Sequence, residues 1–295
     1  MFFSYMIYCF TISMMKKQLL LIAILPLLLS SCYSYNSNKD ISYGEYGERN
    51  LLDISFPNKP TSSLVVYIHG GGWISGSKGN FAEDFAKKYK DGYVYAAINY
   101  RYASNEYHCD DILDDIQKAM LKIKDVCKDN GYTINKVAFF GHSAGGHLSL
   151  LYGYKMKDVC PFKVSFVSSL SGPTDLTDKN YITNTIIGNT YYELMTYMTG
   201  LEINESNFDS YKDELLKHSP INYISNACPT IMCHGESDTV VPLSNALTLK
   251  EKLDATDVAH EFFLYGGGSG HDLNNDKKSE HQYEQKFKEY KTKYL

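Results

Sequence analysis

Long basic runs are absent from this sequence, and their absence excludes one broad class of function. No block of five or more lysines and arginines occurs in the 295 residues, and the formal net charge is −5. A protein whose main partner is nucleic acid needs a concentrated basic footprint, because much of its affinity comes from neutralising phosphates. The composition therefore argues against nucleic acid as the main partner.

Cysteine pairs with metal-binding spacing are also absent. Seven cysteines occur, and no two of them form a C-x-x-C pair. Cys9 and Cys32 precede the part of the chain that we expect to fold, so an odd number remains for the domain. A zinc framework needs paired ligands, and a domain of this size does not depend on a disulfide framework. We expect neither framework, and the sequence leaves a single disulfide open.

The first 31 residues have the composition of an export signal. Two lysines precede an apolar run over residues 19–29, which small residues follow. A run of about eleven residues containing a proline is too short to span a bilayer core of ~30 Å. Because residues 1–13 contain no lysine or arginine, Met14 or Met15 is the expected translation start.

The end of this signal, Leu29-Ser30-Ser31-Cys32, resembles the lipobox of bacterial lipoproteins. In that family, cleavage leaves the cysteine as a lipidated N-terminus, so we expect lipid on Cys32 and a polar tether over residues 32–40. The expected location is therefore the cell envelope, as an exported and membrane-anchored lipoprotein. An ordinary secretory signal, giving a periplasmic or secreted protein, is the alternative.

Strands of the buried type alternate with helices along the rest of the chain. After a starting antiparallel hairpin over residues 41–57, continuous apolar runs predict strands at 63–69, 93–100, 136–140, 162–170, 229–234 and 260–265. Apolar residues at helical spacing predict helices at 81–90, 110–128, 146–152, 243–253 and 279–295. This alternation is typical of a mostly parallel central sheet with helices on both faces. We therefore expect one α/β domain over residues 41–295.

Residues 174–217 interrupt this alternation. They are polar, rich in tyrosine and asparagine, and longer than a plain connection between a strand and a helix. We interpret them as a small helical, cap-like insertion over the upper edge of the sheet, where they would form a wall of a substrate site.

The pentapeptide Gly141-His142-Ser143-Ala144-Gly145 stands between a predicted strand and a predicted helix. A G-x-S-x-G sequence in that context is typical of a nucleophile elbow, in which a sharp turn presents the serine. The flanking glycines avoid the collisions that Cβ atoms would cause at such a turn. Ser143 is therefore the candidate nucleophile of a hydrolase.

An acid and a histidine that could activate Ser143 each follow a later predicted strand. Asp238 lies in the loop after the last strand but one, and Glu236 in the same loop is the alternative acid. His271 lies in a glycine-rich loop after the last strand. The order serine, acid, histidine is that of hydrolases built on this arrangement of strands. We therefore expect Ser143, Asp238 and His271 to form a catalytic triad.

The glycine run in His69-Gly70-Gly71-Gly72-Trp73 follows another predicted strand. Three glycines let the backbone N–H groups of Gly71 and Gly72 point into a pocket, and the N–H of Ala144 would be a third donor. A phosphate-binding role does not fit, because no G-x-G-x-x-G occurs and no Gly-Lys-Ser/Thr follows. The run therefore predicts an oxyanion hole.

Together these segments resemble the α/β-hydrolase superfamily. The resemblance is carried by His69-Gly70-Gly71-Gly72-Trp73, Asn99-Tyr100-Arg101-Tyr102, the stretch 141–148, Ser219-Pro220 and the stretch 234–242. Within the superfamily they are similar to the HGGGW carboxylesterases related to hormone-sensitive lipase and to bifunctional acetylxylan/feruloyl esterases. The resemblance covers residues 50–283 and implies an α/β-hydrolase fold with the triad and the oxyanion donors named above. The glycine run before His271 is longer than the family leads us to expect, which leaves the resting position of that loop open.

We therefore expect a serine esterase that cleaves small or carbohydrate-linked acyl esters through an acyl-enzyme, with no metal or organic cofactor. Kynurenine formamidases share much of the pattern, so a related amidase is the alternative. A non-catalytic binding lipoprotein on a retained hydrolase fold is an alternative from a different class. The expected partners are a small-molecule or carbohydrate ester and, through the lipid anchor, a membrane. Acyl-chain length, the alcohol and the oligomeric state are not readable from the sequence.

Overall fold

The computed structural model describes residues 33–295. The expected export signal, the translation start at Met14 or Met15 and the lipidated Cys32 lie outside the described residues. Within the described range, no helix combines the length and the apolar character needed to cross a membrane.

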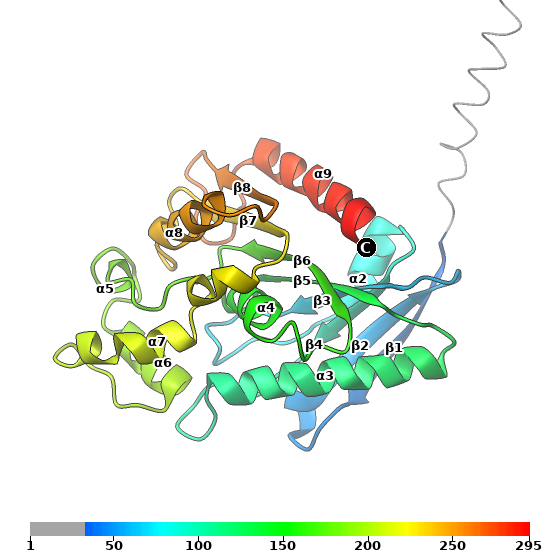
Figure 1. Ribbon diagram of the computed structural model, residues 1–295, viewed down its shortest axis with the longest axis horizontal. Helices are drawn as coiled ribbons and strands as arrows, with labels where there is room; N and C mark the ends of the chain where they lie inside the picture. Colours follow the sequence, from blue (N-terminus) through cyan, green and yellow to red (C-terminus); the bar gives the residue numbers. More distant parts are fainter. Residues whose placement is uncertain (1–32) are drawn as a thin grey trace, which may run out of the picture.

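An eight-stranded sheet runs through the described part of the chain, in the order β1-β2-β4-β3-β5-β6-β7-β8 (Figure 1). Its strands are β1 (Tyr35–Ser42), β2 (Leu51–Pro57), β3 (Ser63–Ile68), β4 (Val94–Ile98), β5 (Lys136–His142), β6 (Lys163–Leu170), β7 (Thr230–Gly235) and β8 (His260–Tyr265). The first two pairings are antiparallel, and all pairings from β4 to β8 are parallel. The carboxyl ends of β3 and β5 are therefore neighbours at one edge of the sheet.

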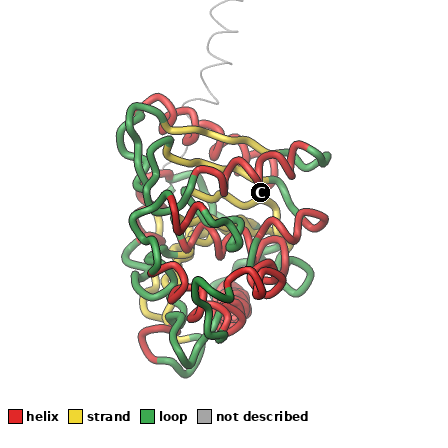
Figure 2. Tube along the Cα trace, turned by 90° about the vertical axis from the view of Figure 1, so that its left-hand side faces the viewer, coloured by secondary structure: helices red, strands yellow, loops and turns green. Residues whose placement is uncertain are grey.

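Helices cover both faces of this sheet (Figures 1 and 2). They are α2 (Phe81–Tyr89), α3 (Cys109–Asp129), α4 (Ala144–Lys155), α5 (Asn180–Thr183), α6 (Thr190–Thr199), α7 (Lys212–Lys217), α8 (Leu243–Asp254) and α9 (Lys277–Tyr294), with short 3-10 helices η1 (Gly47–Asn50), η2 (Phe208–Tyr211) and η3 (Pro220–Asn226). α2 and α9 share one hydrophobic core, and α3, α4 and α8 share the other. The mostly parallel sheet between two helical layers confirms the predicted fold class.

Strand β3 shows why apolar residues run continuously through the central strands. Leu64, Val66 and Ile68 face the core beneath α3 and α4, whereas Val65 and Tyr67 face the core beneath α2 and α9. Successive side chains of a strand point to opposite faces, so a strand covered on both faces must be apolar at every position.

The expected tether over residues 32–40 is wrong for most of its length. Residues from Tyr35 onward belong to β1, which pairs with β2 in antiparallel register from Tyr35 opposite Pro57 to Ser42 opposite Leu51. β1 lies at the edge of the sheet and is only partly buried, so its polar sequence is compatible with a strand. The domain therefore begins before residue 41. Its first strand is held by backbone hydrogen bonds, which require no hydrophobic pattern in the sequence.

The predicted insertion over residues 174–217 is helical, with α5, α6, η2 and α7. It is attached to loops at the carboxyl edge of the sheet. The backbone N–H of Ile186 donates to Thr239 O over 2.8 Å, and Nδ1 of His108 lies 2.9 Å from Tyr197 O. The insertion therefore lies beside the loops that follow β4 and β7.

A buried ion pair fastens β1 to the rest of the domain. Nζ of Lys78 lies 2.8 Å from Oδ1 of Asp40 and 2.7 Å from Oδ1 of Asp53, and Asp53 is only 3 % exposed. The N–H of Asp40 also donates to Oδ1 of Asp53 over 2.8 Å. Lys78 therefore neutralises the buried Asp53 of β2 and also pairs with Asp40 of β1, whose side chain is 67 % exposed.

Replacing Lys78 by methionine should destabilise the fold strongly. Breaking a buried ion pair from one side leaves an uncompensated charge, which typically costs about 3–5 kcal/mol of unfolding free energy. The matched control is Lys39→Met, because Nζ of Lys39 pairs with Glu83 over 2.7 Å on a side chain that is 42 % exposed. Urea unfolding should show a large decrease in the free energy of unfolding for K78M and a much smaller decrease for K39M. Equal losses would show that the buried pair does not hold β1.

Candidate active site

Ser143 stands at a sharp turn between β5 and α4. Its φ of 55° and ψ of −126° form a combination that non-glycine residues rarely adopt. Its N–H donates to Leu170 O on β6 over 2.8 Å, which ties the turn to the sheet. A Cβ on Gly145 would lie 2.0 Å from Ile68 O, and one on Gly141 would lie 2.5 Å from the same oxygen. Both glycines are therefore required because the end of β3 passes directly against the turn.

Asp238 and His271, from the loops after β7 and β8, form a hydrogen-bonded pair. Nδ1 of His271 lies 2.8 Å from Oδ2 of Asp238. The other carboxylate oxygen, Oδ1, accepts hydrogen bonds from the backbone N–H groups of Val240 (2.8 Å) and Val241 (2.9 Å). The Asp238 side chain is completely buried, whereas that of His271 is 16 % exposed. The acid thus lies behind the imidazole, and the imidazole lies nearer to solvent.

The surroundings of Asp238 fix which ring nitrogen of His271 carries hydrogen. Burial alone would raise the pKa of Asp238, but the hydrogen bond and charge of His271 and the two backbone N–H groups hold it below its usual value. Asp238 is therefore ionised at neutral pH and accepts a hydrogen from Nδ1. In the neutral imidazole, Nε2 then has the free lone pair that a general base needs.

His142, the residue before Ser143, holds the His271 loop against the turn. Nε2 of His142 lies 2.7 Å from His271 O and donates to it, and the two ring centroids are 4.8 Å apart. Within residues 33–295, no hydrogen bond joins Oγ of Ser143 to the imidazole of His271. Asp238 therefore contacts His271, and the His271 loop contacts the turn that carries Ser143, but the serine hydroxyl is not bonded to the imidazole. Such bonds are often long in sites without substrate.

The glycine run lies against the same turn. A Cβ on Gly70 would lie 2.6 Å from His142 O and 3.3 Å from Cβ of Ser143. Gly71 has a φ of 109° and Gly72 a φ of 58°, backbone conformations that favour glycine. In the described part of the chain, the N–H groups of Gly71, Gly72 and Ala144 donate to no protein acceptor. The structure therefore leaves the three expected donors free beside the serine.

Glu236 and His147 lie near the site but support its backbone and do not contact His271 as an acid would. Oε1 of Glu236, the alternative acid, accepts the N–H of Gly268 over 2.8 Å, so this carboxylate supports the backbone of the His271 loop. His147, inside α4, accepts from Nε1 of Trp73 over 3.1 Å and donates to His218 O over 2.7 Å. Burial lowers the pKa of His147 to about 4, so it is a neutral link between α4 and the glycine run. Neither this link nor the role of His142 can be predicted from the sequence, because the hydrogen-bond partners are backbone carbonyls or neutral side chains.

A cavity of about 330 Å³ lies between α2 and α9 and reaches the back of the site. Its lining includes His142, Asp272 and Leu273 together with aromatic side chains such as Phe85 and Tyr283. Neither Ser143 nor His271 is among the described residues that line it. The cavity therefore backs the His271 loop and is separate from the face where the serine and the glycine run meet.

Residues 33–295 contain no group of three or more histidine, cysteine or acidic side chains placed to hold a metal ion. The cysteines of this range, Cys109, Cys127, Cys160, Cys228 and Cys233, are all free thiols. The single disulfide that the sequence left open is therefore not formed within this range.

Comparison with known proteins places this geometry in context. Residues 52–253 match the BD-FAE family. The chain is 29 % identical over 243 residues to the probable carboxylic ester hydrolase LipM of Mycobacterium tuberculosis (strain ATCC 25618 / H37Rv), covering 77 % of this chain and 54 % of that protein. It is 26 % identical over 270 residues to the isoprenylcysteine alpha-carbonyl methylesterase ICME of Arabidopsis thaliana, covering 85 % of this chain and 61 % of that protein. The chain thus spans little more than half the length of these curated relatives.

Two solved structures show a similar arrangement of strands and helices. A truncated form of a carbohydrate esterase from gut microbiota aligns with a TM-score of 0.69 at 21 % identity, covering 88 % of this chain and 98 % of that one. Esterase B from Lactobacillus Rhamnosis (HN001) also gives a TM-score of 0.69, at 17 % identity over 88 % of this chain and 85 % of that one. At such identities the likeness concerns the fold, which is the α/β-hydrolase fold.

Gly145→Ala should damage the fold, because its methyl group would meet the backbone of β3. Atoms of Ile68 and His69 would lie 2.0 and 2.7 Å from the new Cβ, and a strand backbone cannot turn aside as a side chain can. We expect the free energy of unfolding to fall by more than the ~1–3 kcal/mol that is usual when a core is overpacked. The control is Gly270→Ala, next to His271, where the nearest atom lies 3.8 Å away. Thermal unfolding of the two variants provides the measurement, and a G145A protein as stable as G270A would contradict the close contact.

Proposed function

Since this chain belongs to the BD-FAE family, we propose that it is a serine hydrolase of carboxylic esters, with Ser143, His271 and Asp238 as its triad. One observation carries the proposal: the buried Asp238 orients His271, and His142 fastens the His271 loop to the turn that presents Ser143. This is the relation of acid, base and nucleophile that acyl transfer needs. The names of the relatives, a carboxylic ester hydrolase and a methylesterase, support the same reaction class.

In the proposed mechanism, Nε2 of His271 accepts the proton of the Ser143 hydroxyl as the oxygen attacks the ester carbonyl. Asp238 keeps the hydrogen of the imidazole on Nδ1 and stabilises the imidazolium that forms. His271 then gives its proton to the departing alcohol, which leaves an acyl-enzyme. Water repeats the sequence and releases the acid.

The negative charge that develops on the carbonyl oxygen needs donors that are already in place. The free N–H groups of Gly71, Gly72 and Ala144 are the proposed donors, because Ala144 follows Ser143 and the glycine run packs against the serine turn at Gly70. In other hydrolases, removing one such donor lowers kcat about 10²–10³-fold. Each donor of the glycine run should therefore contribute substantially to the rate, although less than Ser143 itself.

Small or carbohydrate-linked acyl groups are the proposed substrates. A solved structure of the same fold is a carbohydrate esterase, and the insertion over residues 174–217 would form a wall of the substrate site at the carboxyl ends of the strands. A formamidase-like amidase is the competing substrate class. A panel of p-nitrophenyl esters, acetylated xylan and N-formylkynurenine would separate them, because each class predicts a different preferred member.

Ser143→Ala should abolish hydrolysis of p-nitrophenyl acetate, with a loss of at least about 10⁴-fold in kcat, as for other triad serines. The matched control is Ser149→Ala, because Ser149 is buried in α4 with a hydroxyl that has no protein partner. A fluorophosphonate probe should label the wild type and S149A but not S143A. Activity of S143A near that of the wild type would refute the triad. A wild type that neither reacts nor hydrolyses would favour a binding protein.

The sequence before the domain supports a further proposal, that the protein is held at a membrane of the cell envelope through lipid on Cys32. β1 begins at Tyr35, three positions after Cys32, so such an anchor would keep the domain close to the membrane surface. Cys32→Ser should move the protein from the membrane fraction to the soluble fraction in its native host. Cys160→Ser, which changes a free thiol of the domain, is the control and should leave the protein in the membrane fraction. Equal membrane fractions for both variants would contradict the anchor.

A further inference from the structure

Three successive carbonyl groups at the start of the glycine run each accept a hydrogen bond from a side chain. His69 O accepts from the hydroxyl of Tyr100 over 2.8 Å. Gly70 O lies 2.7 Å from Nδ1 of His69, which must carry the hydrogen because a carbonyl only accepts. Gly71 O accepts from the hydroxyl of Ser75 over 2.7 Å. The side chains of three residues therefore fix three neighbouring peptide groups.

Fixing these carbonyls also fixes the N–H groups of the same peptides. A peptide group is planar and trans, so its N–H points away from its C=O. Because Gly70 O is held by His69 and Gly71 O by Ser75, the N–H groups of Gly71 and Gly72 each point away from the oxygen of their own peptide group. These are the two proposed oxyanion donors of the run, and they have no protein acceptor within the described residues. Their direction is thus set before any substrate binds.

The segment of residues 99–103, which follows β4, holds the glycine run from behind. The ring of Tyr100 stacks on that of His69 with centroids 4.1 Å apart and an interplanar angle of 11°, and Tyr100 is fully buried. The N–H of Ala103 donates to Trp73 O over 3.0 Å, and the hydroxyl of Tyr102 donates to Gly76 O. Tyr100 and Ala103 therefore contact the two ends of the run, and Tyr102 contacts Gly76 just beyond it.

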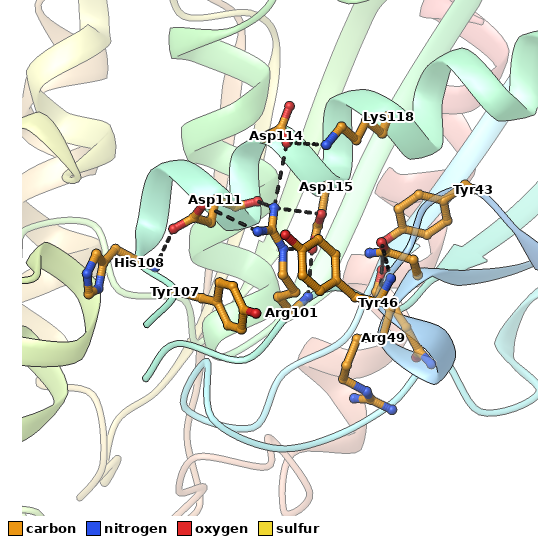
Figure 3. A network of polar contacts seen from close by, with 12 residues as sticks. Tyr43, Tyr46, Arg49, Arg101, Tyr107, His108, Asp111, Asp114, Asp115 and Lys118 are labelled. Carbon is orange, nitrogen blue, oxygen red and sulfur yellow. Dashed lines mark hydrogen bonds and ion pairs between the residues drawn. The ribbon is translucent and has the colours of Figure 1, made fainter. Parts of the chain in front are cut away.

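Arg101, within this segment, points to the acidic side chains of α3 and anchors the segment there (Figure 3). Its backbone N–H and its Nε both donate to Oδ2 of Asp115, over 2.8 and 2.9 Å, and one terminal nitrogen donates to Oδ1 of Asp115 over 2.9 Å. The guanidinium lies over the rings of Tyr46 and Tyr107, at 4.2 and 5.0 Å from their centroids.

Both partners of this pair are enclosed, with Arg101 4 % and Asp115 0 % exposed. A bidentate pair held on both oxygens, with a further bond to the backbone, leaves the segment little freedom to shift. The position of Tyr100 is therefore determined by the residue that follows it in the sequence.

We propose that Tyr100 is a positioning residue for the oxyanion hole and that the Arg101–Asp115 pair holds it in place. This rests on the proposed esterase function. Tyr100 touches no reacting atom. Its hydroxyl holds the peptide group between His69 and Gly70, which precedes the two donor peptide groups. Its ring stacks on the imidazole of His69, which in turn holds the carbonyl of Gly70. Through these contacts it sets the direction of the donors for the transition state without binding the ground-state ester.

Tyr100→Phe tests this role, because it removes only the hydroxyl and keeps the stacked ring. We expect kcat for p-nitrophenyl acetate to fall about 10-fold, less than the ~10²–10³-fold for a lost donor, with KM changed less than 2-fold. A trifluoromethyl ketone forms a tetrahedral adduct with the serine and places an oxyanion in the hole. Its inhibition constant should weaken by the same factor as kcat/KM falls, which a purely structural role would not produce.

The matched control is Tyr154→Phe. Tyr154 is also fully buried, and its hydroxyl bonds to Oγ1 of Thr230 over 2.6 Å. Thr230 is the first residue of β7, so this bond lies at the amino ends of the parallel strands, away from the glycine run. Y154F should keep kcat and the inhibition constant of the wild type, even where its thermal stability falls as much as that of Y100F. If Y100F and Y154F have the same kcat/KM, Tyr100 is structural only and the inference fails.

Asp115→Asn tests the anchor separately. It should reproduce the loss of kcat and of ketone affinity seen for Y100F, and the double variant should lose less than the product of the two factors, because both changes act on one segment. If the loss of kcat in the double variant equals the product of the two single losses, the Arg101–Asp115 pair does not act through Tyr100. An inactive wild type that fails to react with the fluorophosphonate refutes the proposed function itself. An active wild type with an unchanged Y100F refutes only this inference.

Discussion

The end of β3 and the first turn of α4 lie too close together for any side chain to fit between them. A Cβ on Gly145 would stand 2.0 Å from Ile68 O, and one on Gly70 would stand 2.6 Å from His142 O. The approach follows from the sheet, because β3 and β5 are parallel neighbours whose last paired residues are Ile68 and Gly141. The serine turn and the glycine run therefore meet at one point, and every other part of the site is arranged around that contact.

Two sides of this contact are held in different ways. On one side, His142 donates to His271 O, and the buried Asp238 orients the imidazole. On the other side, Tyr100 holds His69 O and the segment after β4 supports the glycine run. Each support is a side chain on or next to a strand of the sheet, which places the reacting groups more accurately than flexible loops would. The loops that carry the chemistry are thus fastened at both ends to the rigid part of the fold.

The sequence predicts the parts of this structure that depend on residue type. Central strands are apolar throughout because both of their faces are buried, and His271 and Asp238 follow strands whose carboxyl ends share an edge. Strand β1 was missed because an edge strand is held by backbone pairing, which needs no apolar residue. The choice between Asp238 and Glu236 stayed open in the sequence because the direction of a loop side chain has no periodicity. His142 and Tyr100 were not identified because their partners are backbone carbonyls, which every residue has.

Charge and positioning are separated in this site. The groups that hold the glycine run are neutral: two hydroxyls and His69, whose pKa burial lowers to about 4. The cation in the segment behind them, Arg101, forms a buried pair with Asp115 and faces α3. A full charge beside the donors would change the field where the oxyanion forms and would respond to pH, whereas oriented dipoles do neither. Burying the ion pair behind the segment therefore gives a firm anchor, and the donors that we propose for the developing charge are backbone N–H groups.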